Sequence, residues 1–273
     1  MTRALSLAAL TVLDLAPPEQ VRCAAGAGYS HVGLRPVPAT DSEPTWALVG
    51  DTPLRRDVLA ALRDSGIGVL DIEILRLKPE TDVAAFEPVL ETGAVLGARF
   101  VLVAGNDPDE ARTVERLGCL AELASRYGLM PCLEPMPWTD VGDFAQALRI
   151  VEATGRGDVG VLVDPLHFDR GGSDAVEIGS AAPGRLPYMQ LCDAPAERPS
   201  DLQGLLLQAR AERLPPGEGG LDLRRLLAAM PAGQPLSLEV PMVSRGLAPL
   251  ARARLVRDTT CRWLAGGESG AAA

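Results

Sequence analysis

Four short apolar runs in the second half of the chain each end on a side chain that can bind a cation. The runs are residues 131–134, 159–164, 186–190 and 235–239, and they end on Glu134, Asp164, Gln190 and Glu239. Short apolar runs are typical of strands buried on both faces. In barrels of parallel strands, functional side chains lie at the carboxyl ends of the strands. If the four runs are parallel strands of one barrel, these four side chains meet at one mouth.

Strand-like and helix-like stretches alternate along the chain. The strand ends at Glu73, Ala104, Glu134 and Asp164 are about 30 residues apart, which is the size of one strand–helix unit. The chain has 273 residues, and a (β/α)8 barrel needs about 250. We therefore predict an α/β fold with one (β/α)8 TIM barrel over residues 1–265, followed by a flexible tail at 266–273.

The expected elements follow from apolar patterning and from Gly and Pro positions. Besides the four runs above, the expected strands are 4–12, 30–35, 69–75 and 100–104, and the expected helices are 18–27, 55–65, 86–96, 111–127, 144–153, 221–229 and 247–264. Residues 193–213 form a long, mixed insertion in the seventh unit. A segment of that length at the active face is more typical of a lid or a substrate wall than of a spacer.

The four strand-end side chains supply only oxygen ligands. Three carboxylates and one amide suit Mg²⁺ or Mn²⁺ better than zinc or copper. The whole chain has two histidines, which counts against a histidine-rich zinc site. The alternative interpretation is that each side chain caps a strand or pairs with a basic residue. Four such residues at successive strand ends favour a metal site.

Charge and cysteine usage limit the partners. The net charge of −10 repels nucleic-acid phosphates, so we expect no nucleic-acid partner. No apolar run approaches the roughly 20 residues that a membrane helix needs, so we expect no membrane partner. The five cysteines are scattered and lack C-x-x-C spacing, which indicates a reducing, cytoplasmic setting.

Five segments resemble the sugar phosphate isomerase/epimerase family, the xylose isomerase-like TIM barrels. They are Leu-Glu-Pro-Met at 133–136, Val-Asp-Pro-Leu-His at 163–167, Met-Gln-Leu-Cys-Asp-Ala at 189–194, Arg-Leu-Pro-Pro-Gly-Glu-Gly at 213–219 and Ser-Leu-Glu-Val-Pro at 237–241. The resemblance extends over nearly the whole chain. It implies one divalent metal ion bound by Glu134, Asp164, Gln190 and Glu239, and it suggests a homodimer.

The resemblance also implies roles for individual residues. Glu134 and Glu239 match the two glutamates that move protons in the ketose isomerases and epimerases of this family. His167 and Arg213 match residues that contact the substrate's oxygens. Metal chelation of two neighbouring substrate oxygens would acidify the adjacent C–H and stabilise an enediolate. The alternatives are that His167 only orients a ligand and that Arg213 forms a surface ion pair.

Four further residues are candidates for the pocket wall, namely Glu73, Arg76, Asn106 and Trp138. Glu73 and Arg76 lie near the tip of the third expected strand, and Asn106 follows the fourth. Trp138 lies in the proline-rich segment after Glu134. Each could equally serve packing or be a solvated polar group, so these four assignments stay open.

Gln190 departs from many epimerases of the family, which have histidine at this position. Glutamine there, followed by Asp193-Ala194-Pro195, is similar to the 3-dehydroshikimate dehydratases of the same superfamily. The favoured function is a metal-dependent isomerase or epimerase acting on a small ketose or keto-polyol. A dehydratase using the same site is the alternative, and a barrel that binds a sugar or a partner without catalysis is a third possibility.

Overall fold

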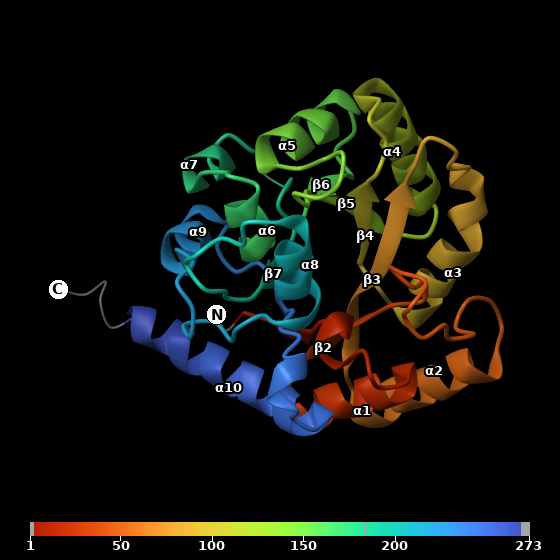
Figure 1. The fold of residues 1–273 in the computed structure, drawn as a ribbon. Helices are drawn as coiled ribbons and strands as arrows, with labels where there is room; N and C mark the ends of the chain where they lie inside the picture. Colours follow the sequence, from red (N-terminus) through yellow and green to blue (C-terminus); the bar gives the residue numbers. More distant parts are fainter. Residues whose placement is uncertain (1–2, 183, 269–273) are drawn as a thin grey trace.

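The computed structural model describes residues 3–182 and 184–268, in which eight parallel strands line a ring enclosed by helices (Figure 1). The strands are β1 (Leu5–Leu7), β2 (His31–Leu34), β3 (Gly68–Leu77), β4 (Phe100–Gly105), β5 (Met130–Glu134), β6 (Gly160–Val161), β7 (Met189–Leu191) and β8 (Leu236–Leu238). Their hydrogen-bonded order is β6-β5-β4-β3-β2-β1-β8-β7. Every strand except the two at the ends of this order therefore pairs with its neighbours in sequence.

A parallel bridge between Val163 and Met189 joins the two ends of this order. The amide of Gln190 also donates to the carbonyl oxygen of Val163 at 3.0 Å. These contacts close the ring, which confirms the predicted (β/α)8 barrel. Because all eight strands run in the same direction, their carboxyl ends share one mouth.

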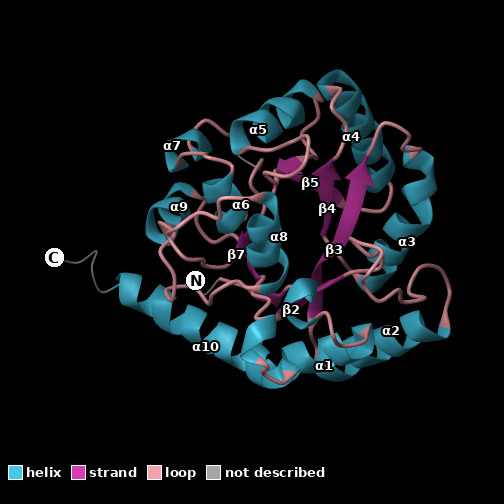
Figure 2. Cartoon of the chain, viewed as in Figure 1, coloured by secondary structure: helices cyan, strands magenta, loops and turns pink. Residues whose placement is uncertain are grey.

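Helices surround the ring, and one of them, at residues 202–211, lies over its mouth (Figure 2). They are α1 (Pro17–Ala27), α2 (Pro53–Ser65), α3 (Glu87–Leu96), α4 (Glu110–Ser125), α5 (Phe144–Ala153), α6 (Pro165–Arg170), α7 (Ala175–Ile178), α8 (Leu202–Ala211), α9 (Leu223–Ala229) and α10 (Pro249–Glu268). The side chains of Asp109 and Asp143 cap α4 and α5 by accepting from the third helical amides. Such caps fix where each helix leaves the barrel mouth.

Side chains fill the barrel interior as well as the layer between strands and helices. Leu70, Leu102 and Leu162 are buried inside the ring, where the rings of Phe100 and Tyr188 stack with centroids 4.8 Å apart. The interior is thus a packed core rather than a channel.

The first predicted strand is too long. Only Leu5–Leu7 is a strand, and Ala9–Val12 is a 3-10 helix. This turn brings Thr11 to the end of β8, where its hydroxyl donates to Leu238 O at 2.8 Å and accepts from Val240 N at 2.8 Å. These two bonds satisfy buried backbone groups, which a continuing first strand would leave unpaired.

Two further expectations concern the end of the chain and the long insertion. The last helix, α10, extends to Glu268, and residues 269–273 lie outside the described ranges, so the flexible tail at 266–273 stays a prediction. Within the insertion at 193–213, α8 reaches the barrel mouth, where Ala209 and Arg210 line the cavity. The insertion therefore supplies a wall of the cavity.

Candidate active site

A cavity opens at the carboxyl ends of the strands, and it gathers most of the predicted site residues. Its charged and aromatic lining consists of Arg35, Glu43, Glu73, Arg76, Glu134, Trp138, His167, Arg210, Arg213 and Glu239. Asp164 and Gln190 are buried beside this lining and contact it through hydrogen bonds. The strand-end argument thus located a common site.

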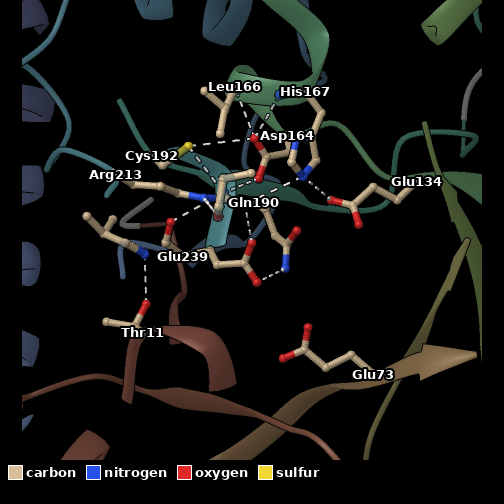
Figure 3. Close-up of polar contacts among 12 residues, drawn as sticks. Thr11, Glu73, Glu134, Asp164, Leu166, His167, Gln190, Cys192, Arg213 and Glu239 are labelled. Atoms are coloured by element: carbon tan, nitrogen blue, oxygen red, sulfur yellow. Dashed lines mark hydrogen bonds and ion pairs between the residues drawn. The ribbon is translucent and has the colours of Figure 1, made fainter. Parts of the chain in front are cut away.

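Glu134, Asp164 and His167 form the tightest group of possible ligands (Figure 3). Glu134 ends β5, and Asp164 caps α6 by accepting from the amides of Leu166 at 2.8 Å and His167 at 3.3 Å. The cap turns the His167 side chain toward Glu134, with Nε2 3.8 Å from Oε1. One ligand atom from each of the three residues lies within 4.8 Å of the others.

Arg213 lies inside the site, between two of the predicted ligands. Its Nη1 is 2.5 Å from Asp164 Oδ2, and its Nη2 is 2.8 Å from Glu239 Oε2. Its Nε donates to the carbonyl oxygen of Ala209 in α8 at 2.7 Å, which fixes the guanidinium. Arg213 is only 2% exposed, so the alternative of a surface ion pair is wrong. Its charge compensates two buried carboxylates.

Gln190 is fully buried and is connected to Glu239. Its Nε2 donates to Glu239 Oε1 at 3.1 Å, whereas its Oε1 has no hydrogen-bond partner in residues 3–182 and 184–268. A buried amide oxygen without a partner is costly unless a donor or a cation satisfies it. This orientation presents to the site the atom that could bind a metal ion.

Burial and neighbouring charges separate the pKa values of the site. Burial raises the pKa of Glu134 well above its ordinary value, and the charges of Asp164 and Glu239 raise it further. Burial also raises the pKa of Glu239, to about 7, although Arg213 opposes the shift. Burial lowers the pKa of His167 to about 4. For Asp164, burial is outweighed by Arg213 and His167, and the pKa is lowered.

The donor set fits a divalent cation. Glu134 Oε1 and Gln190 Oε1 are buried without hydrogen-bond partners among the residues with assigned positions. Carboxylate and amide oxygens with one imidazole are ligands that Mg²⁺, Mn²⁺ or zinc can share. Glu239 is not part of the group of Glu134, Asp164 and His167, and its carboxylate pairs with Arg213. The fourfold set of Glu134, Asp164, Gln190 and Glu239 therefore stays a prediction.

The structure also places the candidates for the pocket wall. Glu73 is 2% exposed and accepts from Arg35 at 3.3 Å, and Figure 3 shows its carboxylate facing the space beside Gln190 and Glu239. The ring of Trp138 packs edge-on against that of His167, with centroids 4.9 Å apart. Asn106 lies farther out and accepts from Arg76 Nη1 at 2.9 Å, where both line an adjoining outer pocket.

Sequence reasoning missed Arg35, Glu43 and Arg210. Arg35 follows β2 directly, so the strand-end argument that identified Glu134 could also have identified it. It pairs with Glu43 at 2.9 Å and with Glu73 at 3.3 Å. Glu43 and Arg210 come from irregular or inserted segments, whose direction no periodic pattern predicts.

A family model described as a xylose isomerase-like TIM barrel matches residues 21–264. The chain belongs to this family. This membership confirms the resemblance seen in the sequence, and the eight-stranded ring agrees with it. In the part of the chain that the structure describes, no helix is long and apolar enough to cross a membrane.

Curated relatives match the chain over part of its length. An inosose isomerase of Bacillus velezensis is 29% identical over 158 residues, which cover 54% of each protein. A 3-dehydroshikimate dehydratase of Pseudomonas aeruginosa is 30% identical over 154 residues, which cover 53% of this chain and 24% of the relative. The chain thus spans about half the length, or less, of these relatives.

Solved structures match over nearly the whole chain. A structure of IOLI protein with a binding zinc atom aligns with a TM-score of 0.79 at 20% identity, covering 96% of this chain and 98% of that one. An L-ribulose 3-epimerase aligns with a TM-score of 0.69 at 18% identity, covering 99% and 97%. These likenesses establish the shared fold.

Proposed function

We propose that this protein is a divalent-metal-dependent isomerase or epimerase that moves a proton at the carbon next to the carbonyl of a small ketose or keto-polyol. The observation that carries the proposal is the pair Glu134 and Glu239, two buried carboxylates with raised pKa values in one cavity, beside Asp164 and His167, which with Glu134 could hold a cation. The inosose isomerase relative and the shared barrel fold support it.

The two glutamates have the properties that acid–base catalysis requires. A carboxylate whose pKa lies near neutral pH can both take and return a proton, and Glu239 has a pKa of about 7. Glu134 belongs to β5 and Glu239 follows β8, so the two approach the cavity from different strands. We assign proton removal and proton return to this pair.

The site would hold a metal ion, and its other polar residues would bind and orient the substrate. The metal ion would be held by Glu134, Asp164, Gln190 and Glu239, with His167 as a further donor beside them. The ion would supply Lewis-acid polarisation of the substrate carbonyl. His167 and Arg213 would contact substrate oxygens, and Trp138 would cover the cavity and exclude water. Arg213 would also stabilise negative charge that develops on oxygen.

Elemental analysis of the purified protein tests the metal-dependent proposal first. We expect near-stoichiometric divalent metal in the wild type and its loss in the double variant Glu134→Ala/Glu239→Ala. Incubation with ketoses in D₂O should then incorporate deuterium at the carbon next to the carbonyl. Absence of metal in both proteins, even after incubation with Mn²⁺ and with Zn²⁺, would contradict the proposal.

A dehydratase is the second candidate, and Gln190 together with the 3-dehydroshikimate dehydratase relative favours it. Dehydration begins with the same proton abstraction but ends with loss of a hydroxyl group. The mass of the product distinguishes the two reactions. Unchanged mass indicates isomerisation or epimerisation, and loss of one water from 3-dehydroshikimate indicates dehydration.

A further inference from the structure

Two arginines stand at the outer part of the cavity, above the carboxylates. Arg76 comes from the carboxyl-terminal part of β3, and Arg210 comes from the last turn of α8. Both side chains line the inner cavity and also the outer pocket that adjoins it. They therefore border the passage between the two spaces.

Neither arginine has a carboxylate partner among residues 3–182 and 184–268. The half-buried Arg76 donates only to neutral oxygens, to Asn106 Oδ1 at 2.9 Å and to Ala39 O at 3.4 Å. The exposed Arg210 makes no side-chain hydrogen bond or ion pair with the described residues. The other two arginines of the cavity, Arg35 and Arg213, each pair with two glutamates or aspartates.

The two cations also repel each other. Burial lowers the pKa of Arg76, and the charge of Arg210 lowers it further, although the more distant carboxylates of Glu134 and Glu43 oppose the shift. A half-buried guanidinium that has no carboxylate within hydrogen-bond distance is stabilised when an anion approaches it. Guanidinium groups bind carboxylate and phosphate oxygens through paired hydrogen bonds. This part of the cavity is therefore suited to an oxyanion.

We propose that Arg76 and Arg210 bind an anionic group, a carboxylate or a phosphate, at the end of the substrate farther from the reacting carbon. This inference rests on the proposed function, because it takes the reacting end of the substrate to lie at Glu134 and Glu239. The carboxylates of the inner cavity repel the anionic group of the substrate, so that end of the substrate faces outward. The two arginines then determine both substrate class and orientation.

Three carboxylates also line the outer pocket, Asp41, Glu80 and Asp140. All three are exposed, and none pairs with Arg76 or Arg210. Water and salt screen these exposed carboxylates strongly, and they screen the exposed Arg210 as well, whereas the half-buried Arg76 keeps more of its attraction. The charge of Arg76 therefore attracts an anionic ligand more strongly than the exposed carboxylates repel it.

Calorimetric titration with three unreactive ligands tests the proposal. The probes are D-sorbitol, which is neutral, D-gluconate, which carries a carboxylate, and D-sorbitol 6-phosphate. We expect at least one anion to bind the metal-loaded protein about tenfold more tightly than sorbitol. Arg76→Gln and Arg210→Gln should each remove most of this preference, since a charge-assisted hydrogen bond contributes roughly a factor of ten or more. Sorbitol affinity should change less than about twofold.

Matched variants separate charge from structure. Arg63→Gln removes an exposed arginine of α2 and should leave all three affinities unchanged, and Arg76→Lys should keep part of the anion preference. The exposed Arg210 tests the idea even if Arg76→Gln fails to fold. Comparison of gluconate with the phosphate then identifies which oxyanion the pair prefers.

Other outcomes would overturn the proposal. Equal affinities for sorbitol and both anions would refute the anion site and leave the proposed function standing. An anion preference that survives both arginine variants but disappears after EDTA treatment would assign the anion to the metal. Failure of every ligand to bind, together with absence of metal, would refute the anion site and the proposed function together.

Discussion

The floor of the cavity and its rim differ in how their charges are compensated. At the floor, Arg213 pairs with Asp164 and Glu239, and Arg35 pairs with Glu43 and Glu73. At the rim, Arg76 and Arg210 have no such partners within the described ranges. An unpaired charge that is fully buried destabilises the fold, so it has to be neutralised by other residues of the protein. An exposed or half-buried charge is solvated by water and can remain unpaired until a ligand binds. The floor is thus built for stability and chemistry, and the rim for recognition.

The largest expected effect is on turnover at the floor. Glu134→Gln and Glu239→Gln should each lower kcat by about 10³-fold, because a neutral amide cannot remove a proton. Steady-state kinetics with the substrate found in the D₂O screen measures this. Glu110→Gln, which alters an exposed ion pair with Arg149, is the matched control and should keep full activity. Wild-type activity in either floor variant would remove that glutamate from the proton-transfer pair.

Arg213→Gln sharpens the comparison through stability and metal binding. Removing the arginine leaves Asp164 and Glu239 buried without compensation, which should cost the metal-free protein about 3–5 kcal/mol of unfolding free energy. A divalent ion would then replace the lost positive charge, so added Mn²⁺ should raise the melting temperature more in the variant than in the wild type. Denaturation with and without Mn²⁺ measures both effects. An equal rise in both proteins would show that Arg213 does not compete with the metal.

Acid stability tests the burial of His167. Its pKa is about 4 in the folded protein and 6.5 ordinarily, so between these pH values the unfolded chain binds a proton that the folded protein does not. Stability should therefore fall as the pH falls from about 6.5 to 4, by roughly 3 kcal/mol for this group. His167→Gln should remove that part of the loss from EDTA-treated protein in urea titrations.

The half-buried His31 provides the control for this experiment. Burial lowers its pKa as well, and since it is only half-buried we expect His31→Gln to have the smaller effect. An identical pH dependence in wild type and His167→Gln would mean that His167 is already accessible to water and protons.

The smallest expected effect is on stability at the rim. Arg210→Gln should change the free energy of unfolding by less than about 0.5 kcal/mol, because Arg210 is exposed and unpaired within residues 3–182 and 184–268. Arg35→Gln, in the same cavity, should cost about 3 kcal/mol because it leaves Glu43 and Glu73 uncompensated. Urea denaturation of the two variants compares them directly. Similar losses would erase the distinction between floor and rim.

The sequence predicted much of the fold because barrel strands and helices follow local patterns. The apolar run ending at Glu134 lies on β5, the run ending at Asp164 contains β6, and the helices at 55–65 and 144–153 match α2 and α5 within two residues at each end. The error at residues 4–12 has the same origin, since an apolar run does not distinguish a strand from the 3-10 turn that a tertiary contact of Thr11 stabilises.

The sequence by itself indicated that Glu134, Asp164, Gln190 and Glu239 lie near the mouth, because each ends a strand-like run, but it missed Arg35, Glu43 and Arg210. Only the tertiary structure decided how they pair: Arg213 enters between Asp164 and Glu239, His167 lies beside Glu134, and Arg210 at the rim pairs with no carboxylate of the described residues. These pairings depend on the position of α8 and on the burial of the side chains by segments that are distant in sequence. Charge compensation is a property of the folded cavity, and no local pattern encodes it.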